Sequence, residues 1–197
     1  IWGGVALGGR EGSGFVALIT RLGFALQGHS FVRKVMTGLV TRLYRAALTQ
    51  AEAVIFQNSD NRDVFLRRRI THASKCCIVS GSGVNTERFA FAPLPESEPV
   101  FLSIGRLLGE KGFREFARAA RLVHKQHPQA RFQILGGEDP SRDGISLSEI
   151  KAWEEQGWVE YLGFADDVRP FLAASHVYVL ASYHEGLPRT VLEAMAM

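Results

Sequence analysis

Short apolar runs alternate with stretches of helical periodicity through the second half of this 197-residue chain. Strands buried on both faces are continuously apolar, whereas the helices that connect them carry one apolar stripe. The alternation therefore predicts an α/β fold with a Rossmann-like parallel sheet covered on both faces. We expect strands at 100–105, 131–137, 158–163 and 176–182, and helices at 111–127, 146–156, 167–174 and from Pro188 onward.

The first half of the chain shows a shorter version of this pattern. Residues 15–20, 53–57 and 76–80 are apolar runs that predict three strands. Asn58 is typical of a helix N-cap, so a helix is expected directly after the strand 53–57. This half is therefore expected to hold a second Rossmann-like sheet.

The stretch 93–99 holds three prolines with Glu-Ser-Glu between two of them, which is the strongest linker signal in the chain. We therefore expect a domain boundary near residue 92, with one domain at 1–92 and another at 93–197. The chain begins at Ile1 and stops at Met197 inside an expected helix. Both domains are accordingly expected to be truncated parts of a longer protein.

Charge is unevenly distributed between the two halves. Residues 1–75 hold 11 Lys/Arg and 4 Asp/Glu, an excess of +7, whereas residues 76–197 hold 12 and 16, a balance of −4. Residues 31–48 predict an amphipathic helix with interleaved basic residues. Such a helix fits an anionic partner, namely a membrane surface, a nucleic acid or a phosphorylated acceptor, and it equally fits a core helix with a solvated basic face.

Several classes of protein are disfavoured. The longest apolar runs fall well short of the roughly 18 residues that span a bilayer. The adjacent Cys76 and Cys77 have neither disulfide nor zinc spacing, which favours a reducing compartment, and both are expected to be buried in a strand. His124 and His127 lack an acidic residue at matching spacing, so no metal site is expected.

The turn after the strand 176–182 carries the strongest chemical signal. Glu185-Gly186-Leu187-Pro188 leads into a helix, and a helix N-terminus binds phosphate through its free backbone N–H groups. Glu193 lies eight helical residues after Glu185, a rise of about 12 Å, close to the span from hexose to ribose in a nucleotide sugar. We therefore expect Glu185 to hold sugar hydroxyls and Glu193 ribose hydroxyls. The adjacent His184 either contacts the same ligand or orders the loop.

A second signal follows the strand 100–105. Arg106 offers a planar fork for phosphate oxygens, and Lys111 offers a mobile positive charge. Both can neutralise a diphosphate leaving group. The run Gly105 to Gly112 is a near miss of a P-loop, with three residues between its first two glycines and no Ser/Thr after the lysine, so an ATPase is disfavoured.

Taken together, these motifs resemble the family-4 glycosyltransferases of the GT-B fold, which have two Rossmann-like domains. Four pieces match in family order: Ser80–Phe89, Gly105-Arg106…Lys111-Gly112, Gly163-Phe164…Asp167-Val168, and Glu185-x7-Glu193. The residues of these motifs are most similar to those of bacterial enzymes that add a sugar to a lipid-linked saccharide. Asn85 departs from the pattern, because the family usually has Asp at that position.

The resemblance implies roles for individual residues. Arg106 and Lys111 would hold the diphosphate of the donor, and Glu185 with Gly186, Leu187 and Pro188 would hold its sugar. Glu193 would bind the ribose, as expected above. Gly163 and Phe164 would lie against the base, and Gly83 would let the loop between the domains approach the donor. Arg106, Lys111 and Glu185 are the residues expected to take part in catalysis.

The resemblance also implies a reaction. Such enzymes transfer a sugar from a nucleotide-diphosphate sugar, usually UDP-linked, with retention of configuration and without a metal. No resident cofactor is expected, because the nucleotide sugar is a substrate. Two alternatives stay open: a GT-B sugar-nucleotide epimerase, and a non-catalytic module that binds a nucleotide sugar or nucleic acid.

The expected partners are a nucleotide sugar and a saccharide or polyprenyl-linked acceptor, with an anionic membrane surface as a further candidate. Nucleic acid is disfavoured, because no aromatic residues are interleaved with the basic ones. The expected location is the cytoplasm, including the inner face of the cytoplasmic membrane.

Overall fold

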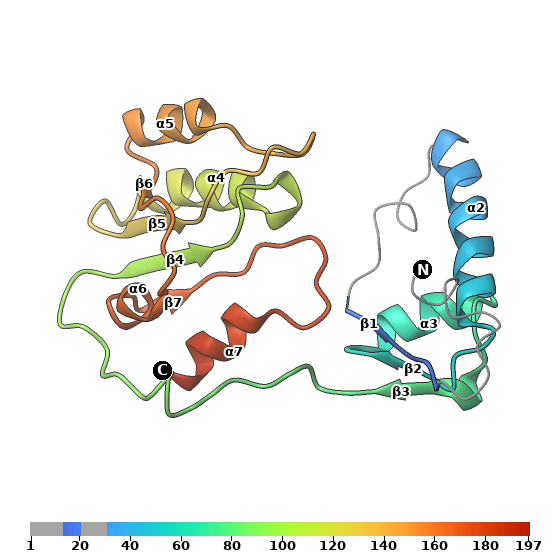
Figure 1. The fold of residues 1–197 in the computed structure, drawn as a ribbon. Coiled ribbons are helices and arrows are strands. Elements are labelled where there is room, and N and C mark those ends of the chain that lie inside the picture. The colour runs from blue at the N-terminus through green and yellow to red at the C-terminus, as the bar shows by residue number, and fades with distance from the viewer. Residues whose placement is uncertain (1–13, 21–30) are drawn as a thin grey trace. The chain divides into compact units, whose positions relative to one another are not determined.

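The computed structural model describes residues 14–20 and 31–197, and the side chains of 31–34 lie outside that description. The chain divides into two compact units, residues 1–83 and 84–197. Each unit has its own parallel sheet and its own helices (Figure 1). The α/β class and the parallel sheets are as the sequence predicts.

In its described residues, the first unit has a three-stranded parallel sheet in the order β1-β2-β3. Its elements are β1 (Val16–Ile19), α2 (Phe31–Leu48), β2 (Ala53–Phe56), α3 (Ser59–Arg67), the 3-10 turn η2 (Ala73–Lys75) and β3 (Cys76–Ile78). Asn58 caps α3, since its side chain accepts a hydrogen bond from the Asn61 amide at 2.8 Å. The core forms where Phe56 of β2 meets Phe65 of α3 edge to face, with ring centroids 5.2 Å apart.

The expectation that both cysteines are buried is wrong. Cys77 is exposed and Cys76 is only partly covered, because β3 is the edge strand of this sheet among the described residues. Cys76 shares a face with the buried Val54, whereas Cys77 pairs with Ile55 on the opposite face. The short apolar run therefore predicted a strand, but it did not predict how far the side chains of that strand are buried.

Helix α2 has two kinds of surface. Thr41, Ala47 and Leu48 are buried, so the C-terminal half of the helix packs into the core. Val35, Met36 and Leu39 are exposed, as is Arg42. The core-packing interpretation is thus confirmed for the C-terminal half, and the binding of an anionic partner by the exposed surface stays a prediction. Among the described residues no helix is long and apolar enough to span a membrane.

The second unit contains a parallel sheet in the order β6-β5-β4-β7. Its elements are β4 (Val100–Ile104), the 3-10 turn η3 (Gly109–Lys111), α4 (Phe113–Val123), β5 (Arg131–Leu135), α5 (Leu147–Glu155), β6 (Glu160–Tyr161), α6 (Arg169–Ala173), β7 (Val177–Tyr178) and α7 (Arg189–Ala196). Every expected strand and helix is present. Strands β6 and β7 are shorter than expected, because the chain leaves the ladder early to form the loops that follow them.

Two apolar clusters cover the two faces of this sheet. Phe113 and Phe116 of α4 and Trp153 of α5 pack with Phe132 of β5 in one cluster. Leu102 of β4 and Leu172 of α6 belong to the other, to which residues of α7 also contribute. Figure 1 shows α4 and α5 on one side of the strands and α6 and α7 on the other. The sheet is therefore doubly covered, as its continuous apolar strands predict.

The expected linker is part of the second unit. The ring of His176 contacts the Pro95 carbonyl at 3.0 Å through Nε2, and its Nδ1 accepts a hydrogen bond from the Val100 amide at 3.1 Å. Phe89 is buried in the second cluster, and the Ala92 amide donates to the Met197 carbonyl at 2.9 Å. The expected boundary near residue 92 thus falls inside the unit that begins at Val84. Whether the two units serve acceptor and donor stays a prediction.

Candidate functional site

The candidate site lies at the carboxyl edge of the second sheet. All four strands are parallel, so the loops that follow them begin at this one edge. Backbone hydrogen bonds fasten these loops to one another in pairs: from the Tyr183 amide to Glu110 (3.0 Å), from Leu107 to Gly137 (2.9 Å), and from Gly136 to Gly163 (2.7 Å).

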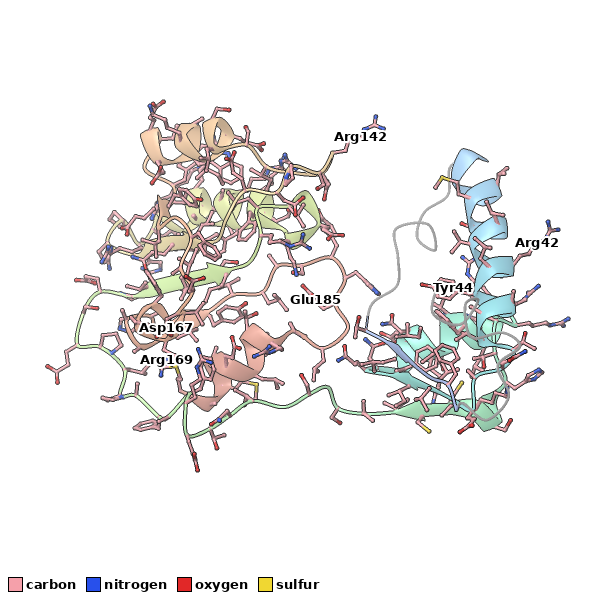
Figure 2. All side chains as sticks on the ribbon, viewed as in Figure 1. Arg42, Tyr44, Arg142, Asp167, Arg169 and Glu185 are labelled. Carbon is pink, nitrogen blue, oxygen red and sulfur yellow. The ribbon has the colours of Figure 1, made fainter. Side chains whose placement is uncertain are left out.

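Lys111 and Glu185 meet at this edge, although 74 residues separate them in sequence. The ammonium nitrogen of Lys111 lies 2.6 Å from Oε1 of Glu185, and the two side chains are only 20% and 18% exposed. Figure 2 shows Glu185 on the loop between β7 and α7. The expectation that these two residues share one place is met, and their shielding from water strengthens their interaction.

Gly112 makes this meeting possible. It has a φ of 75° and precedes α4, and a Cβ at this position would lie 2.1 Å from the Ala181 carbonyl oxygen. Only a residue without a side chain lets the backbone after β4 approach the backbone after β7 so closely. The glycine therefore brings Lys111 into reach of the loop that carries Glu185.

Arg106 reaches the same edge but has a different partner. Its guanidinium forms an ion pair with the carboxylate of Asp139 in the loop after β5, and the Arg106 side chain is 65% exposed. Hydrogen bonds from Ser141, helped by the Arg106 charge, hold the pKa of the Asp139 carboxyl below its usual value. Arg106 is thus an accessible cation that an acidic neighbour orients.

Glu193 lies on α7, where it is buried and pairs with Arg189 at 3.3 Å. Gly186 and Leu187 lie between Glu185 and the helix and are partly buried. Pro188 occupies the N-cap position with a ψ of 117°, one residue before the first helical position that it was expected to favour. The helix still opens directly after the turn, as predicted.

Gly163 and Phe164 form the loop after β6. Gly163 has a φ of 75°, and the Phe164 ring is exposed and lies against the backbone of Gly137. Gly83, with a φ of 71°, is the last residue of the first unit. Whether Gly83 lies beside the donor depends on how the two units are arranged, so this expectation stays a prediction.

Two polar atoms in the loop after β7 lack a partner. Ser182 Oγ and His184 Nε2 are both buried without a hydrogen bond, as are three atoms of Asn61 and Thr71 elsewhere in the described residues. A buried polar atom without a partner costs about 1–3 kcal/mol, so such atoms call for an explanation. Both residues precede Glu185 in the same loop.

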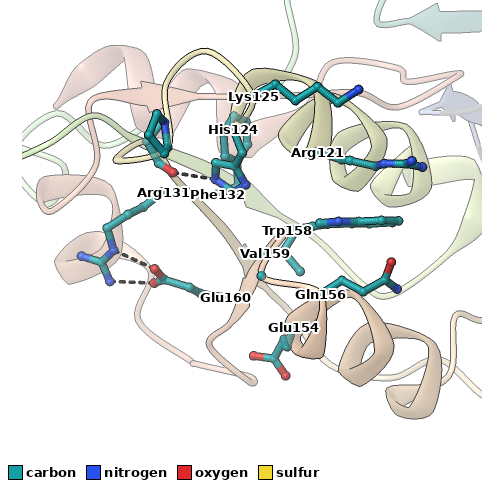
Figure 3. Close-up of a pocket in the computed structure, with 13 residues that line it drawn as sticks. Arg121, His124, Lys125, Arg131, Phe132, Glu154, Gln156, Trp158, Val159 and Glu160 are labelled. Atoms are coloured by element: carbon teal, nitrogen blue, oxygen red, sulfur yellow. Dashed lines mark hydrogen bonds and ion pairs between the residues drawn. The ribbon is translucent and has the colours of Figure 1, made fainter.

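A cavity of about 610 Å³ lies at the opposite edge of the same sheet (Figure 3). Arg121 stacks over the Trp158 ring at 5.2 Å, and Arg131 forms a two-point ion pair with Glu160. Arg121 and Lys125 lie at the C-terminal end of α4, where cations offset the helix dipole. This cavity lies away from the carboxyl ends of the strands, where ligands of such sheets bind.

Within residues 14–20 and 31–197, no group of three or more His, Cys, Asp or Glu side chains is placed to hold a metal ion. His124 uses its Nε2 on the Ala130 carbonyl at 2.7 Å. The metal independence of the chain stays a prediction.

Sequence reasoning missed the acidic residues that organise the cationic loop. Asp139 and Asp143 lie in the polar loop after β5, and both contact the loop that carries Arg106 and Lys111. Their signal was their position in the loop that follows a strand of the parallel sheet, since Arg106 also lies in such a loop.

The fold and the site define a chain of the GT-B kind, an α/β protein with parallel sheets and cationic and acidic loops at one carboxyl edge. Residues 98–197 match the family model described as glycosyl transferases group 1, so the chain belongs to that family. This confirms the resemblance that the motifs carry.

Two sequence relatives are bacterial glycosyltransferases whose names specify lipid-linked acceptors. The chain is 30% identical over 194 residues to the N,N'-diacetylbacillosaminyl-diphospho-undecaprenol alpha-1,3-N-acetylgalactosaminyltransferase of Campylobacter jejuni, covering 91% of this chain and 49% of that protein. It is 26% identical over 161 residues to the UDP-Gal:alpha-D-GlcNAc-diphosphoundecaprenol alpha-1,3-galactosyltransferase of Escherichia coli, covering 73% of this chain and 40% of that protein. The chain thus spans half or less of the length of these relatives.

Solved structures agree on the fold. HepE from Anabaena, crystallised with UDP and glucose, superposes with a TM-score of 0.68 at 17% identity over 93% of this chain and 50% of that chain. At this identity the likeness concerns the fold alone.

We predict that Gly112→Ala destabilises the second unit more than Gly157→Ala does. Gly157 has a similar φ of 67° but open space around the missing Cβ, so its substitution costs only the left-handed strain of about 1–2 kcal/mol. The collision with Ala181 should add about 1–3 kcal/mol at Gly112. Urea unfolding of the two variants measures the difference, and equal destabilisation would contradict the close approach.

Proposed function

We propose that the chain is the donor-binding part of a retaining glycosyltransferase that moves a sugar from a UDP-linked donor to a lipid-linked saccharide. The observation that carries this proposal is the contact of Lys111 with Glu185 at the carboxyl edge of the second sheet. The relatives whose names specify diphospho-undecaprenol acceptors support the acceptor class, and the UDP-Gal in the name of the Escherichia coli relative supports the donor class.

The chemistry follows from charge. As the bond from the sugar to the diphosphate breaks, negative charge gathers on the leaving phosphate oxygens. Lys111 and Arg106 supply positive charge at that place, and the dipole of α7 adds positive potential at the helix N-terminus. Positive charge from these groups takes the place that a metal ion has in other sugar transfers, which is the basis for proposing metal independence.

Glu185 has two partners in this proposal. Without donor it pairs with Lys111. When the diphosphate draws Lys111 away, the carboxylate accepts hydrogen bonds from the transferred sugar. Glu193, on the same helix that the turn opens, is proposed to bind the ribose.

We predict that Lys111→Ala and Glu193→Ala both weaken binding of UDP. Loss of a hydrogen bond to a charged group costs about 1.5–3 kcal/mol, or roughly 10- to 150-fold in affinity. Isothermal titration of UDP into the wild type and the variants measures the change. Lys125→Ala removes an exposed lysine at the opposite edge of the sheet and should leave the affinity unchanged. Unchanged affinity in both site variants would refute the donor site.

We predict that the product keeps the anomeric configuration of the donor and that EDTA leaves the rate unchanged. The chain is incubated with a UDP-sugar and a polyprenyl-diphosphate saccharide, and NMR coupling constants of the new anomeric proton report the configuration. An inverted product would exclude retention, and loss of the rate with EDTA would exclude metal independence. A parallel incubation without acceptor detects an epimerase, because an epimerase converts the UDP-sugar alone.

The exposed surface of α2 is proposed to lie on the inner face of the cytoplasmic membrane, where a lipid-linked acceptor is held. Val35, Met36 and Leu39 would enter the headgroup region, and Arg42, which projects from the helix in Figure 2, would meet anionic lipid. Arg45 is less suited to this role, since its guanidinium donates to backbone carbonyls of Arg68 and Arg69.

We predict that the chain binds vesicles containing phosphatidylglycerol more tightly than vesicles of phosphatidylcholine alone. Each arginine near an anionic surface contributes about 1 kcal/mol, so Arg42→Gln should weaken binding about fivefold. Sedimentation with the vesicles measures this, with Arg118→Gln on α4 as the matched control. Equal binding to both lipids would contradict the proposal.

A further inference from the structure

Asp143 holds the turn that carries Lys111. Its carboxylate Oδ2 accepts a hydrogen bond from the Glu110 amide at 2.8 Å, and its backbone carbonyl accepts one from the Gly109 amide at 2.8 Å. A Cβ on Gly109 would lie 2.7 Å from the Asp143 carboxylate, which shows how closely the two pack. One residue of the loop after β5 thus binds two successive amides of η3.

The same turn is held from its other side. The Glu110 carbonyl accepts the hydrogen bond from the Tyr183 amide at 3.0 Å, in the loop that carries Glu185. Glu110 therefore links the loop after β5 to the loop after β7 through its own backbone. Lys111 is the next residue, so its position depends on both hydrogen bonds.

Simple electrostatics would keep a carboxylate away from a diphosphate. Asp143 is a negative charge close to the loop that the proposed donor would approach, and by Coulomb's law it should oppose an anionic ligand. Its geometry accounts for its presence, because its oxygen accepts the Glu110 amide and fixes the turn. The hydrogen bond and the charge therefore act on donor binding in opposite directions.

We propose that Asp143 is a positioning residue for the donor diphosphate, acting through the Glu110 amide on Lys111 and contacting no substrate itself. This inference rests on the proposed donor site. Asp143→Ala removes both the negative charge and the hydrogen-bond acceptor of the Glu110 amide. The proposal predicts that this change weakens binding of a negatively charged ligand, whereas loss of the charge alone would strengthen it.

The test is a double-mutant cycle in which UDP is titrated into the wild type, Asp143→Ala, Lys111→Ala and the double variant. Asp143→Ala should weaken binding about tenfold in the wild-type background and by less than about twofold when Lys111 is already absent. Asp143→Asn keeps an oxygen acceptor for the Glu110 amide and should retain wild-type affinity within about threefold. Glu155→Ala, an exposed acid on α5, is the control and should change nothing.

The outcomes are distinguishable. If Lys111→Ala weakens binding but Asp143→Ala does not, the positioning role is overturned and the donor site stands. If Asp143→Ala weakens binding equally in both backgrounds, the residue acts through general stability, and the positioning role is again overturned. If the wild type does not bind UDP, or if Lys111→Ala binds it normally, the proposed donor site fails and this inference fails with it.

Discussion

Backbone meets backbone where Gly112 packs against Ala181, with no side chain between them. This approach joins the loop after β4 to the loop after β7, and the hydrogen bond from the Tyr183 amide to Glu110 keeps them in register. Lys111 and Glu185 can then form their ion pair at 2.6 Å. The pair is thus a consequence of a steric condition that only glycine satisfies.

Much of the fold could be predicted from the sequence because it depends on local patterns. Continuous apolar runs identified the strands, and Asn58 identified the start of α3. The meeting of Lys111 and Glu185 was also predictable, since all strands that end in polar loops share one edge when the sheet is parallel. None of these inferences depends on knowing which side chains contact one another.

The features that were mispredicted or missed depend on contacts between distant parts of the chain. The proline-rich stretch 93–99 has the composition of a linker, but the ring of His176, far along the sequence, contacts the Pro95 carbonyl within it and the Val100 amide directly after it. Cys77 is of a residue type that is usually buried, but it is exposed because β3 is an edge strand among the described residues. Asp143 lies in a polar stretch that is typical of a solvated loop, and only the position of the Glu110 amide shows that its carboxylate accepts a hydrogen bond.

The two cations of the candidate site differ in how readily a ligand could recruit them. Arg106 is 65% exposed and pairs with Asp139, and an ion pair so accessible to water contributes about 0–1 kcal/mol. A diphosphate could therefore take this guanidinium at small cost. Lys111 and Glu185 are both largely covered, so breaking their contact costs more than breaking the exposed pair. In the proposed donor site, a nucleotide sugar would offset that cost with a phosphate for Lys111 and hydroxyl groups for Glu185. The difference between the two cations therefore follows from burial rather than from the identity of the residues.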